Sequence, residues 1–303
     1  MVNPQQKQAA VGDLSDQGLS MRTSCTLVQV ERKGLYYKPK LSEENQQITA
    51  YLKETAFNYI RWGLPRMVSV VRDKFGAVNH KRVRRLYCAA RLQVPKRPRK
   101  HTKYRTKPLV QAERPNHRWS MDFVSDSFIY GRRFRVLNII DDFTRELIHQ
   151  VVDTSISGIR VARELSEISI HRSLPEFIVC DNGPEFRSSV MFKWSQDNEV
   201  DLSFIAPGKP QQNAFVESFN GKFRKECLDL NCFRDLLEAR DVIMNWRLDY
   251  NMNRPHSSLN YIPPAKFREN YENNVDSKHV KLHAVHKWVR VTPCYFIFTT
   301  LAE

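Results

Sequence analysis

The segment RWSMDFV, residues 118–124, decides the fold of this chain. Apolar and polar residues alternate along it, so that Trp119, Met121 and Phe123 lie on one face of an extended strand and Asp122 lies on the other. The stretches FRVLNIIDD and RELIHQVVD follow after short connections and have the same strand-forming composition. Together the three stretches predict an antiparallel meander at the start of a sheet.

Helices and strands alternate downstream of this meander. A helix is expected after Gly158, and PEFIVC predicts a short buried strand that ends at Asp181. A second helix, the strand DLSFIA and a long helix through Glu217 complete the pattern. This order is typical of an α/β fold in which helices flank a mixed sheet.

A basic helical segment precedes the sheet. One helix is expected from Ser42, a second ends at Gly76, and a third follows Asn79 and carries the run KRVRRLYCAARL. Two helices joined across a short glycine-containing turn predict a small all-α, helix-turn-helix-like DNA-binding domain. A structural helical hairpin with a solvated basic face is the alternative. The candidate DNA contacts of this domain are Lys81, Arg82 and Arg85.

Positive charge is concentrated in the same part of the chain. The net charge is +15, and between Phe57 and Arg118 there are 18 Lys and Arg but only two acids. So many positive charges repel one another unless a polyanion neutralises them. The asymmetry therefore favours nucleic acid as a partner over a merely solvated basic face.

The composition of the chain limits the class of protein to which it can belong. With 303 residues and a hydrophobic content of 41%, it can bury a substantial core. No signal peptide or bilayer-spanning apolar run is evident, and the six cysteines form no CxxC pair, so we expect a cytoplasmic protein without a membrane partner.

The sequence patterns divide the chain into five parts. The predicted parts are a loosely structured segment (1–40), the helical domain (41–94), a basic linker (95–115), the α/β core (116–268) and a divergent tail (269–303).

Three carboxylates occupy positions that suit a metal site. Asp122 lies midway along the first strand, Asp181 ends a later strand, and Glu217 lies on a helix, with 35 residues between the last two. If the two strands are neighbours, the aspartates meet at one edge of the sheet and the helix brings the glutamate to them. Clustered acids repel one another by about 4 kcal/mol per pair at 4 Å. Mg²⁺ would relieve this repulsion, because it prefers oxygen ligands.

Other acids near these positions suit a metal site less well. Asp141 and Asp142 end a strand, where capping of a turn is the expected role. Asp126 shares a strand face with Asp122 but lies nearer the end of the sheet. Glu185 lies beyond a turn, so it would contact a metal only through other groups.

The helix of Glu217 offers candidate DNA contacts. Asn213, Asn220 and Arg224 lie on the same helix face as Glu217, at −4, +3 and +7. Arg224 suits a phosphate beside the metal site. A surface arginine without such a role is the alternative.

Several motifs in a fixed order carry a resemblance to a known family. WSMDFV, GRRFRVLNIIDDFTRE, DNGPEF, PGKPQQNAFVESFNGKFRKECL and YNMNRPHSSLNYIPPAKF resemble the catalytic core of bacterial insertion-sequence transposases encoded by two overlapping reading frames. The chain resembles the product of the second frame, and NHKRVRRLYC resembles the basic helical domain that precedes that core. The similarity runs from about Tyr36 to Phe267.

The resemblance implies a ribonuclease-H-like fold and a DDE-type polynucleotidyl transferase. It places the catalytic, metal-binding triad on Asp122, Asp181 and Glu217. It also implies two Mg²⁺ ions, with Mn²⁺ as a substitute, that support strand cleavage and strand transfer at the ends of the element. The implied partners are element-end and target DNA and further copies of the chain on that DNA. The implied location is the bacterial cytoplasm, in association with the nucleoid.

Two functional alternatives remain beside an active transposase. No heptad run occurs near the start of the chain, so the first-frame product or a fusion transposase is expected as a partner. Without it, the chain would be a catalytically silent DNA-binding fragment or regulator that occupies element ends. A plain ribonuclease H is a third option, which the basic helical domain and the spacing from Asp181 to Glu217 disfavour.

Overall fold

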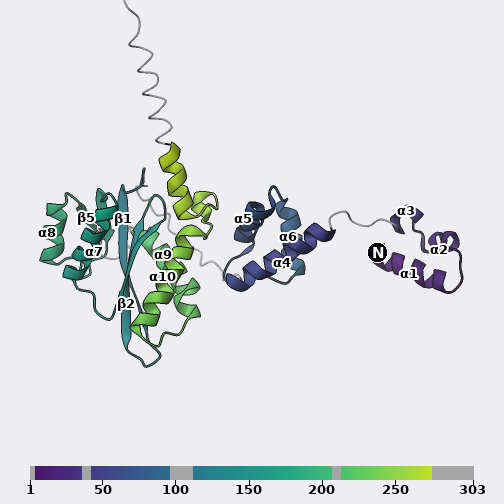
Figure 1. The fold of residues 1–303 in the computed structure, drawn as a ribbon, viewed down its shortest axis with the longest axis horizontal. Coiled ribbons are helices and arrows are strands. Elements are labelled where there is room, and N and C mark those ends of the chain that lie inside the picture. Colours follow the sequence, from purple (N-terminus) through teal and green to yellow (C-terminus); the bar gives the residue numbers. More distant parts are fainter. Residues whose placement is uncertain (1–3, 36–41, 96–111, 207–212, 275–303) are drawn as a thin grey trace, which may run out of the picture. The chain divides into compact units, whose positions relative to one another are not determined.

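The computed structural model describes residues 4–35, 42–95, 112–206 and 213–274. The chain forms two compact units, Met1–Val94 and Pro95–Glu303, which are treated separately (Figure 1). Most of the predicted basic linker and of the divergent tail lies outside the described residues. Within the described residues, the helices are too short or too polar to cross a bilayer.

The N-terminal residues are helical, so the prediction of a loosely structured segment over residues 1–40 is wrong for the part that the structure describes. Ser20 caps a helix by accepting a hydrogen bond from the backbone N–H of Thr23 at 3.2 Å, and Val11 and Cys25 are buried. Each helix buries few apolar residues, so the polar composition of the segment gave no periodic signal from which a helix could be predicted. The helices are α1 (Pro4–Asp16), α2 (Met21–Val28) and α3 (Arg32–Leu35).

The predicted basic helical domain is present as three helices around a small core. They are α4 (Ser42–Asn58), α5 (Leu64–Phe75) and α6 (His80–Ala89). Gly76 ends α5 at a φ of 79°, a left-handed conformation that favours glycine. Asn79 caps α6 by accepting from the N–H of Lys81 at 2.9 Å. The core includes Ile48, Leu52, Met67, Val71 and Val83, which are fully buried.

The second unit is built on a five-stranded mixed sheet in the order β3-β2-β1-β4-β5. Its strands are β1 (Arg118–Ser127), β2 (Arg133–Asp141), β3 (Leu147–Asp153), β4 (Phe177–Cys180) and β5 (Asp201–Phe204). The first three form the predicted antiparallel meander, and β4 pairs in parallel with both β1 and β5. The neighbourhood of β1 and β4, on which the predicted meeting of Asp122 and Asp181 depends, is therefore confirmed.

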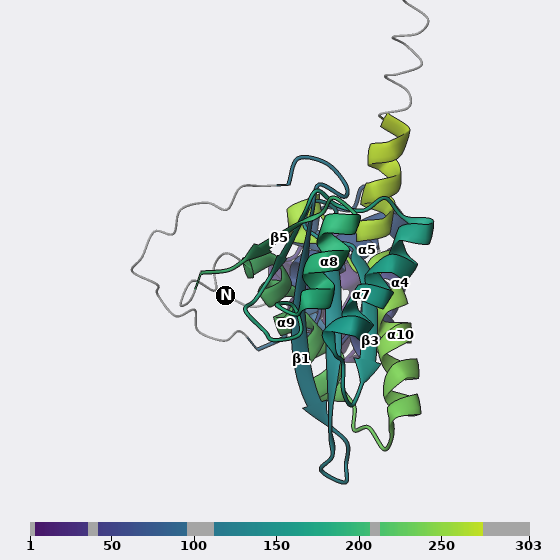
Figure 2. The ribbon, with the colours of Figure 1, turned by 90° about the vertical axis from the view of Figure 1, so that its left-hand side faces the viewer.

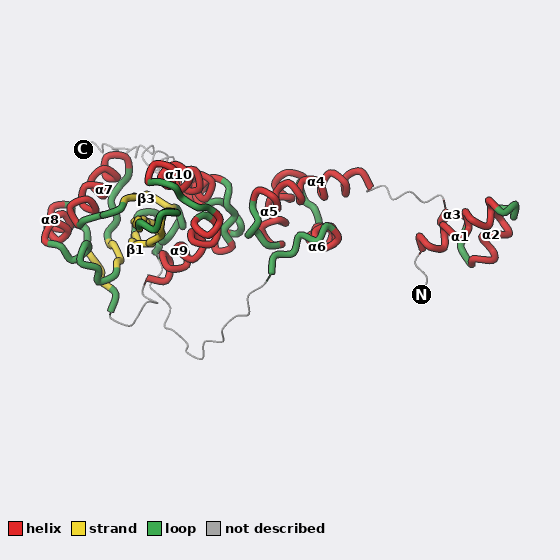
Figure 3. The backbone as a smooth tube through the Cα atoms, turned by 90° about the horizontal axis from the view of Figure 1, so that it is seen from below, coloured by secondary structure: helices red, strands yellow, loops and turns green. Residues whose placement is uncertain are grey.

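Helices cover both faces of this sheet (Figures 1 and 3). One face packs on α7 (Gly158–His171) and α8 (Ser189–Asp197), and the other packs on α9 (Ala214–Glu226) and α10 (Leu236–Met252). Alternate residues of β1 point to the two layers: Met121 packs on the α7 side, whereas Val124 packs on the α9 side. Asp122 shares the face of Val124 and so lies beneath α9.

Helix α10 lies along the outer strand β3 and occupies its free backbone groups (Figure 2). The amide of Asn251 bonds both the N–H and the C=O of Leu147, each at 2.9 Å. Farther along the strand, Arg240 donates to the carbonyl of Val152 at 2.9 Å. These side chains satisfy backbone groups that would otherwise offer a template for pairing with another strand.

The described core continues beyond the predicted boundary at residue 268. Residues 264–274 are helical, and the rings of Phe267 and Tyr271 lie 5.7 and 5.1 Å from that of Phe143. These aromatic contacts hold the helical segment against the turn between β2 and β3.

Candidate active site

Asp122 is the half-buried acid at the centre of the candidate site. Its Oδ1 accepts a hydrogen bond from the backbone N–H of Phe123 at 2.8 Å, and its Oδ2 accepts from Nδ2 of Asn220 at 2.7 Å. Within the described residues, each carboxylate oxygen thus has one donor. Since a carboxylate oxygen has two lone pairs, each keeps a second position for another ligand.

The parallel register of β1 and β4 brings Asp181 alongside Asp122. Ser120 pairs with Val179, and each aspartate lies two residues farther along its strand direction. Neighbouring strands lie about 4.8 Å apart. Asp181 is the first residue after β4, where its Oδ1 accepts from the N–H of Gly183 at 2.9 Å.

Glu217 comes to the same region on the first turn of α9. Val216 and Phe219 are buried against the sheet and fix the helix, whereas the side chain of Glu217 is exposed. The α9 helix lies over β1, the strand of Asp122. The acids therefore lie on a strand, at the end of the neighbouring strand and on a covering helix, and their joint role as a metal site remains a prediction.

The carboxylate of Asp122 lies within the electrostatic field of Asp181 and Glu217. Burial, together with the nearby charges of Asp181 and Glu217, raises the pKa of the Asp122 carboxyl from 3.8 to about 6. The hydrogen bonds from Phe123 and Asn220 oppose this rise. Desolvation also raises the pKa of Glu217. The largest effect falls on Asp122 because it is the more buried of the two.

These residues fit a divalent metal ion that is held by few protein ligands. Across the described ranges, no three His, Cys, Asp or Glu side chains lie close enough to form a ready-made metal cage. Mg²⁺ does not require one, because it binds through one or two carboxylates and retains water or substrate phosphate as its other ligands. Burial is the main cause of the raised pKa of Asp122, and the charges of Asp181 and Glu217, which such a cation would neutralise, add to it.

The loop after Asp181 is held against the sheet by contacts that sequence reasoning only partly anticipated. Glu185 forms an ion pair with Arg135 of β2, which lowers the pKa of Glu185. The Arg135 guanidinium also lies 4.0 Å from the ring centroid of Phe123, the neighbour of Asp122. Glu185 therefore links the loop of Asp181 to the strand of Asp122. The expected indirect role of Glu185 remains a prediction, but its partner Arg135 was missed.

Gly158 allows this loop to approach α7 closely. A Cβ at this position would lie 2.1 Å from Oγ of Ser188 and 2.6 Å from the carbonyl oxygen of Glu185. Both distances are far below van der Waals contact, so only glycine fits here without moving the loop.

The rival acids Asp141 and Asp142 have structural partners. Oδ1 of Asp141 accepts from the backbone N–H groups of Phe143 and Thr144 at 2.8 and 3.2 Å, which is the predicted capping of a turn. Asp142 is paired with Arg118 at 2.6 Å and is 2% exposed. Neither carboxylate is available to a ligand at the surface.

The candidate DNA contacts on α9 differ in accessibility. Asn213 is 3% exposed, and its Nδ2 donates to the carbonyl of Met121 at 3.2 Å, so it faces the protein interior. The amide of Asn220 is occupied on both sides, because it donates to Asp122 and accepts from Asn138. Arg224 is exposed while it donates to the carbonyl of Ser125 at 2.9 Å. Among the three, Arg224 is the exposed residue, and its contact with DNA remains a prediction.

The candidate DNA contacts on α6 differ in the same way. Lys81 and Arg85 are exposed. Arg82 instead donates to Asn45 at 2.8 Å and pairs with Glu44 at 2.9 Å, and its side chain is only 17% exposed. It ties α6 to the start of α4 and so stabilises the domain.

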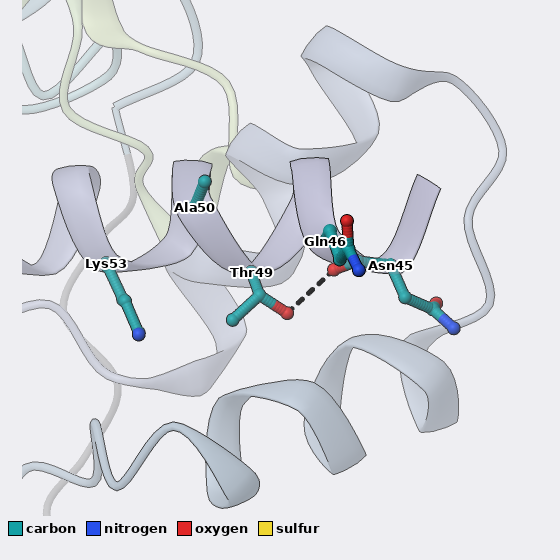
Figure 4. A pocket seen from close by; sticks show the side chains of 5 residues that line it. All are labelled: Asn45, Gln46, Thr49, Ala50 and Lys53. Atoms are coloured by element: carbon teal, nitrogen blue, oxygen red, sulfur yellow. Dashed lines mark hydrogen bonds between the residues drawn. The ribbon is translucent and has the colours of Figure 1, made fainter. Parts of the chain in front are cut away.

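A hollow lies along α4, lined by Asn45, Gln46, Thr49, Ala50 and Lys53 (Figure 4). These residues belong to the N-terminal unit and are separate from the three carboxylates.

A buried ion pair at the far end of α9 was not anticipated. Arg254 is 2% exposed and donates two hydrogen bonds of 2.6 Å to Glu226, the last residue of α9. Arg254 also lies 3.2 Å from Nε2 of His256. The segment NRPH, which contributed only to the resemblance, therefore clamps the helix that carries Glu217.

Comparison with protein families identifies both units. Residues 112–210 and 198–264 match models described as integrase core domain, and residues 43–101 match an HTH-like domain. Solved structures that align with part of this chain include the integrase catalytic core of HTLV-2 in complex with magnesium (17% identity, TM-score 0.39, 52% of this chain and 99% of that one). The BIV integrase catalytic core is another (16% identity, TM-score 0.40, 55% and 99%).

Curated relatives cover most of the chain. A 39.2 kDa protein of insertion element IS476 from Xanthomonas euvesicatoria is 42% identical over 88% of this chain and 78% of its own length. A 31.7 kDa protein of IS407 from Burkholderia multivorans is 42% identical over 86% and 94%. The putative transposase InsK of IS150 from Escherichia coli K12 is 25% identical over 79% and 90%. The chain therefore belongs to the insertion-element transposase family, and its HTH-like domain precedes its integrase core domain.

Proposed function

We propose that this protein catalyses Mg²⁺-dependent cleavage and transfer of DNA strands at the ends of an insertion sequence. The observation that carries the proposal is the parallel register of β1 and β4, which sets Asp181 beside Asp122 under the helix of Glu217. The pKa of Asp122 supports it, because burial and the nearby charges of Asp181 and Glu217 raise that pKa. A half-buried acid whose pKa is raised despite two hydrogen bonds is more typical of a functional site than of a structural one.

Asp122, Asp181 and Glu217 are the proposed ligands of two Mg²⁺ ions. Ions held there would supply electrostatic stabilisation to the entering and departing oxygens of a phosphodiester. The protein contributes the positions of these ligands. Asn220 and the N–H of Phe123 orient Asp122, the N–H of Gly183 orients Asp181, and α9 carries Glu217.

DNA is the proposed polyanionic partner of both units. On the core, Arg224 is exposed on α9, two turns beyond Glu217, at a distance that suits a phosphate near the reacting bond. On the HTH-like domain, exposed Lys81 and Arg85 on α6 are the proposed contacts. The basic segment between Phe57 and Arg118 would add contacts to the DNA backbone.

Further partners follow from the same proposal. DNA ends must be brought together for strand transfer, so we include additional copies of this chain on the DNA. A first-frame product, or its fusion with this chain, is the proposed source of sequence-specific end recognition. Both partners extend the proposal beyond the single chain.

Strand transfer on a labelled element-end duplex with Mg²⁺ tests the proposal. The chain is compared with Asp181→Asn and with Asp126→Asn, which removes an acid from the same strand as Asp122 but outside the proposed triad. Each is assayed with and without the first-frame product. Asp181→Asn is expected to lower product formation at least about 100-fold, while Asp126→Asn retains it. Equal products from the wild type and Asp181→Asn would refute the catalytic assignment. DNA binding without products, even with the partner present, would favour the silent DNA-binding alternative.

A further inference from the structure

Three amide side chains form a row that ends at Asp122. In the sheet register, Asp122 of β1 lies opposite Asn138 of β2, and Asn138 lies opposite Gln150 of β3. Residues paired across neighbouring strands project from the same face. That face is the one covered by α9, from which Asn220 reaches down to the row.

A continuous series of hydrogen bonds connects these residues. Nε2 of Gln150 donates to Oδ1 of Asn138 at 2.7 Å, and Nδ2 of Asn138 donates to Oδ1 of Asn220 at 2.8 Å. Nδ2 of Asn220 then donates to Oδ2 of Asp122 at 2.7 Å. Every bond in the series points toward Asp122. Asn138, in the middle, is 0% exposed.

We propose that Gln150 and Asn138 are positioning residues that, through Asn220, set which carboxylate oxygen of Asp122 is held and which lone pairs face a metal ion. The inference rests on the proposed role of Asp122 as a Mg²⁺ ligand. A buried amide group without a hydrogen-bond partner costs free energy, so the direction of each amide constrains the next. Because Asn138 fills the carbonyl of Asn220, only the NH₂ group of Asn220 can face Asp122.

Among the described residues, the direction of the hydrogen bonds leaves one amide oxygen unpaired at Gln150, the end of the series far from Asp122. Oε1 of Gln150 is buried and has no hydrogen-bond partner within the described part of the chain. The opposite orientation of all three amides would turn the carbonyl of Asn220 toward the carboxylate of Asp122. Two acceptors would then face each other beside a charge, which is worse than one unpaired amide oxygen.

Two substitutions at Gln150 separate this relay from simple electrostatics. Gln150→Lys keeps a donor toward Asn138, whereas Gln150→Glu places an acceptor there, so that one contact in the series must join two acceptors. Position 150 lies two strands from Asp122, about 10 Å at the usual strand spacing. Electrostatics alone predicts that the added negative charge strengthens Mg²⁺ binding and the added positive charge weakens it. The relay predicts the reverse order.

The matched control is Asn251→Asp. Asn251 is a part-buried amide that bonds Leu147 at the same side of the sheet but does not belong to the series. This variant reports the general effect of converting a structural amide to an acid. It is expected to leave Asn220 and Mg²⁺ binding as they are in the wild type.

Two readouts on the full chain without DNA test the inference. In metal-free protein with ¹⁵N-labelled asparagine, the side-chain NH₂ signals of Asn220, identified by their loss in Asn220→Ser, report its orientation. They are expected to move in Gln150→Glu and to stay in Gln150→Lys. Calorimetric titration with Mg²⁺ is expected to show binding about tenfold or more weaker in Gln150→Glu and near the wild type in Gln150→Lys.

Unchanged Asn220 signals in Gln150→Glu would overturn the relay, as would tighter Mg²⁺ binding in Gln150→Glu than in Gln150→Lys. Failure of the proposed function has a different signature. In that case the Asn220 signals respond as expected, yet neither the wild type nor any variant binds Mg²⁺. The orienting series would then stand, while the assignment of Asp122 as a metal ligand would fall.

Discussion

Replacement of Asp122 by asparagine is expected to stabilise the metal-free protein at neutral pH. The folded-state pKa of Asp122, about 6, exceeds its ordinary value of 3.8, so the folded protein binds this proton more tightly than the unfolded chain does. Stability is therefore lost as the pH rises from about 4 through 6, and the full penalty is present above pH 7. An uncharged asparagine removes that penalty.

The size of the effect follows from the same shift. A change of about two pKa units corresponds to about 3 kcal/mol. Partial exposure of the carboxylate reduces this value through solvent screening. Asparagine also has one acceptor oxygen where aspartate uses two, for Phe123 and Asn220, and the lost hydrogen bond costs about 1 kcal/mol. The net expectation is a stabilisation of about 1 kcal/mol, or roughly 3 °C in Tm for a unit of this size.

Thermal unfolding in EDTA at pH 7.5 and pH 4.5 measures this effect, with Asp126→Asn as the control on the same strand. Asp122→Asn should have the higher Tm at pH 7.5, and the difference should shrink at pH 4.5. Addition of Mg²⁺ should raise the Tm of the wild type but not that of Asp122→Asn. A lower Tm for Asp122→Asn at pH 7.5 in EDTA would refute the reasoning, because it would mean that the charge stabilises the fold.

Two further predictions concern the loop of Asp181 and the HTH-like domain. Gly158→Ala should lower strand transfer and Tm, because its Cβ would collide with Ser188. In Gly221→Ala the new Cβ meets nothing within 4 Å, so this variant should raise Tm by stabilising α9 by about 0.5–1 kcal/mol. Equal shifts in Tm for the two variants, measured by calorimetry, would contradict the steric argument. Arg85→Ala should weaken DNA binding in a mobility-shift assay and reduce its salt slope by about one. Arg82→Ala should mainly lower Tm, because Arg82 is bonded within the domain. Weaker DNA binding in Arg82→Ala together with a lower Tm in Arg85→Ala would contradict both assignments.

Local patterns predicted most of the element order. The alternation in RWSMDFV and the glycine and asparagine at the ends of α5 and α6 are signals carried by neighbouring residues, and the structure places these elements where expected. The approach of Asp122 to Asp181 was predicted only on the condition that their strands pair. Nothing local specifies that pairing, since it depends on how the whole meander packs.

The polar interior could not be predicted in the same way. Asn213 and Asn220 share the helix face of Glu217, so helical spacing alone suggests that all three meet the same ligand. Burial separates them, because Asn213 bonds Met121 and Asn220 joins the series from Gln150. That series depends on the register of three strands and on one helix, which are contacts far apart in the chain. The N-terminal helices were missed for a local reason. They bury few residues, such as Val11, and these form too weak a periodic signal.

The anchoring of α9 explains why an exposed Glu217 can serve a defined site. At the start of the helix, the guanidinium of Arg145 lies 3.7 Å from the ring centroid of Phe215. At its end, the buried Arg254 holds Glu226 through two short hydrogen bonds. A helix fixed at both ends defines the position of the Glu217 Cα while its side chain remains free to rotate. Such an arrangement suits a ligand that closes on a metal ion together with the DNA, and it accounts for the lack of a ready-made three-residue cage among the described residues.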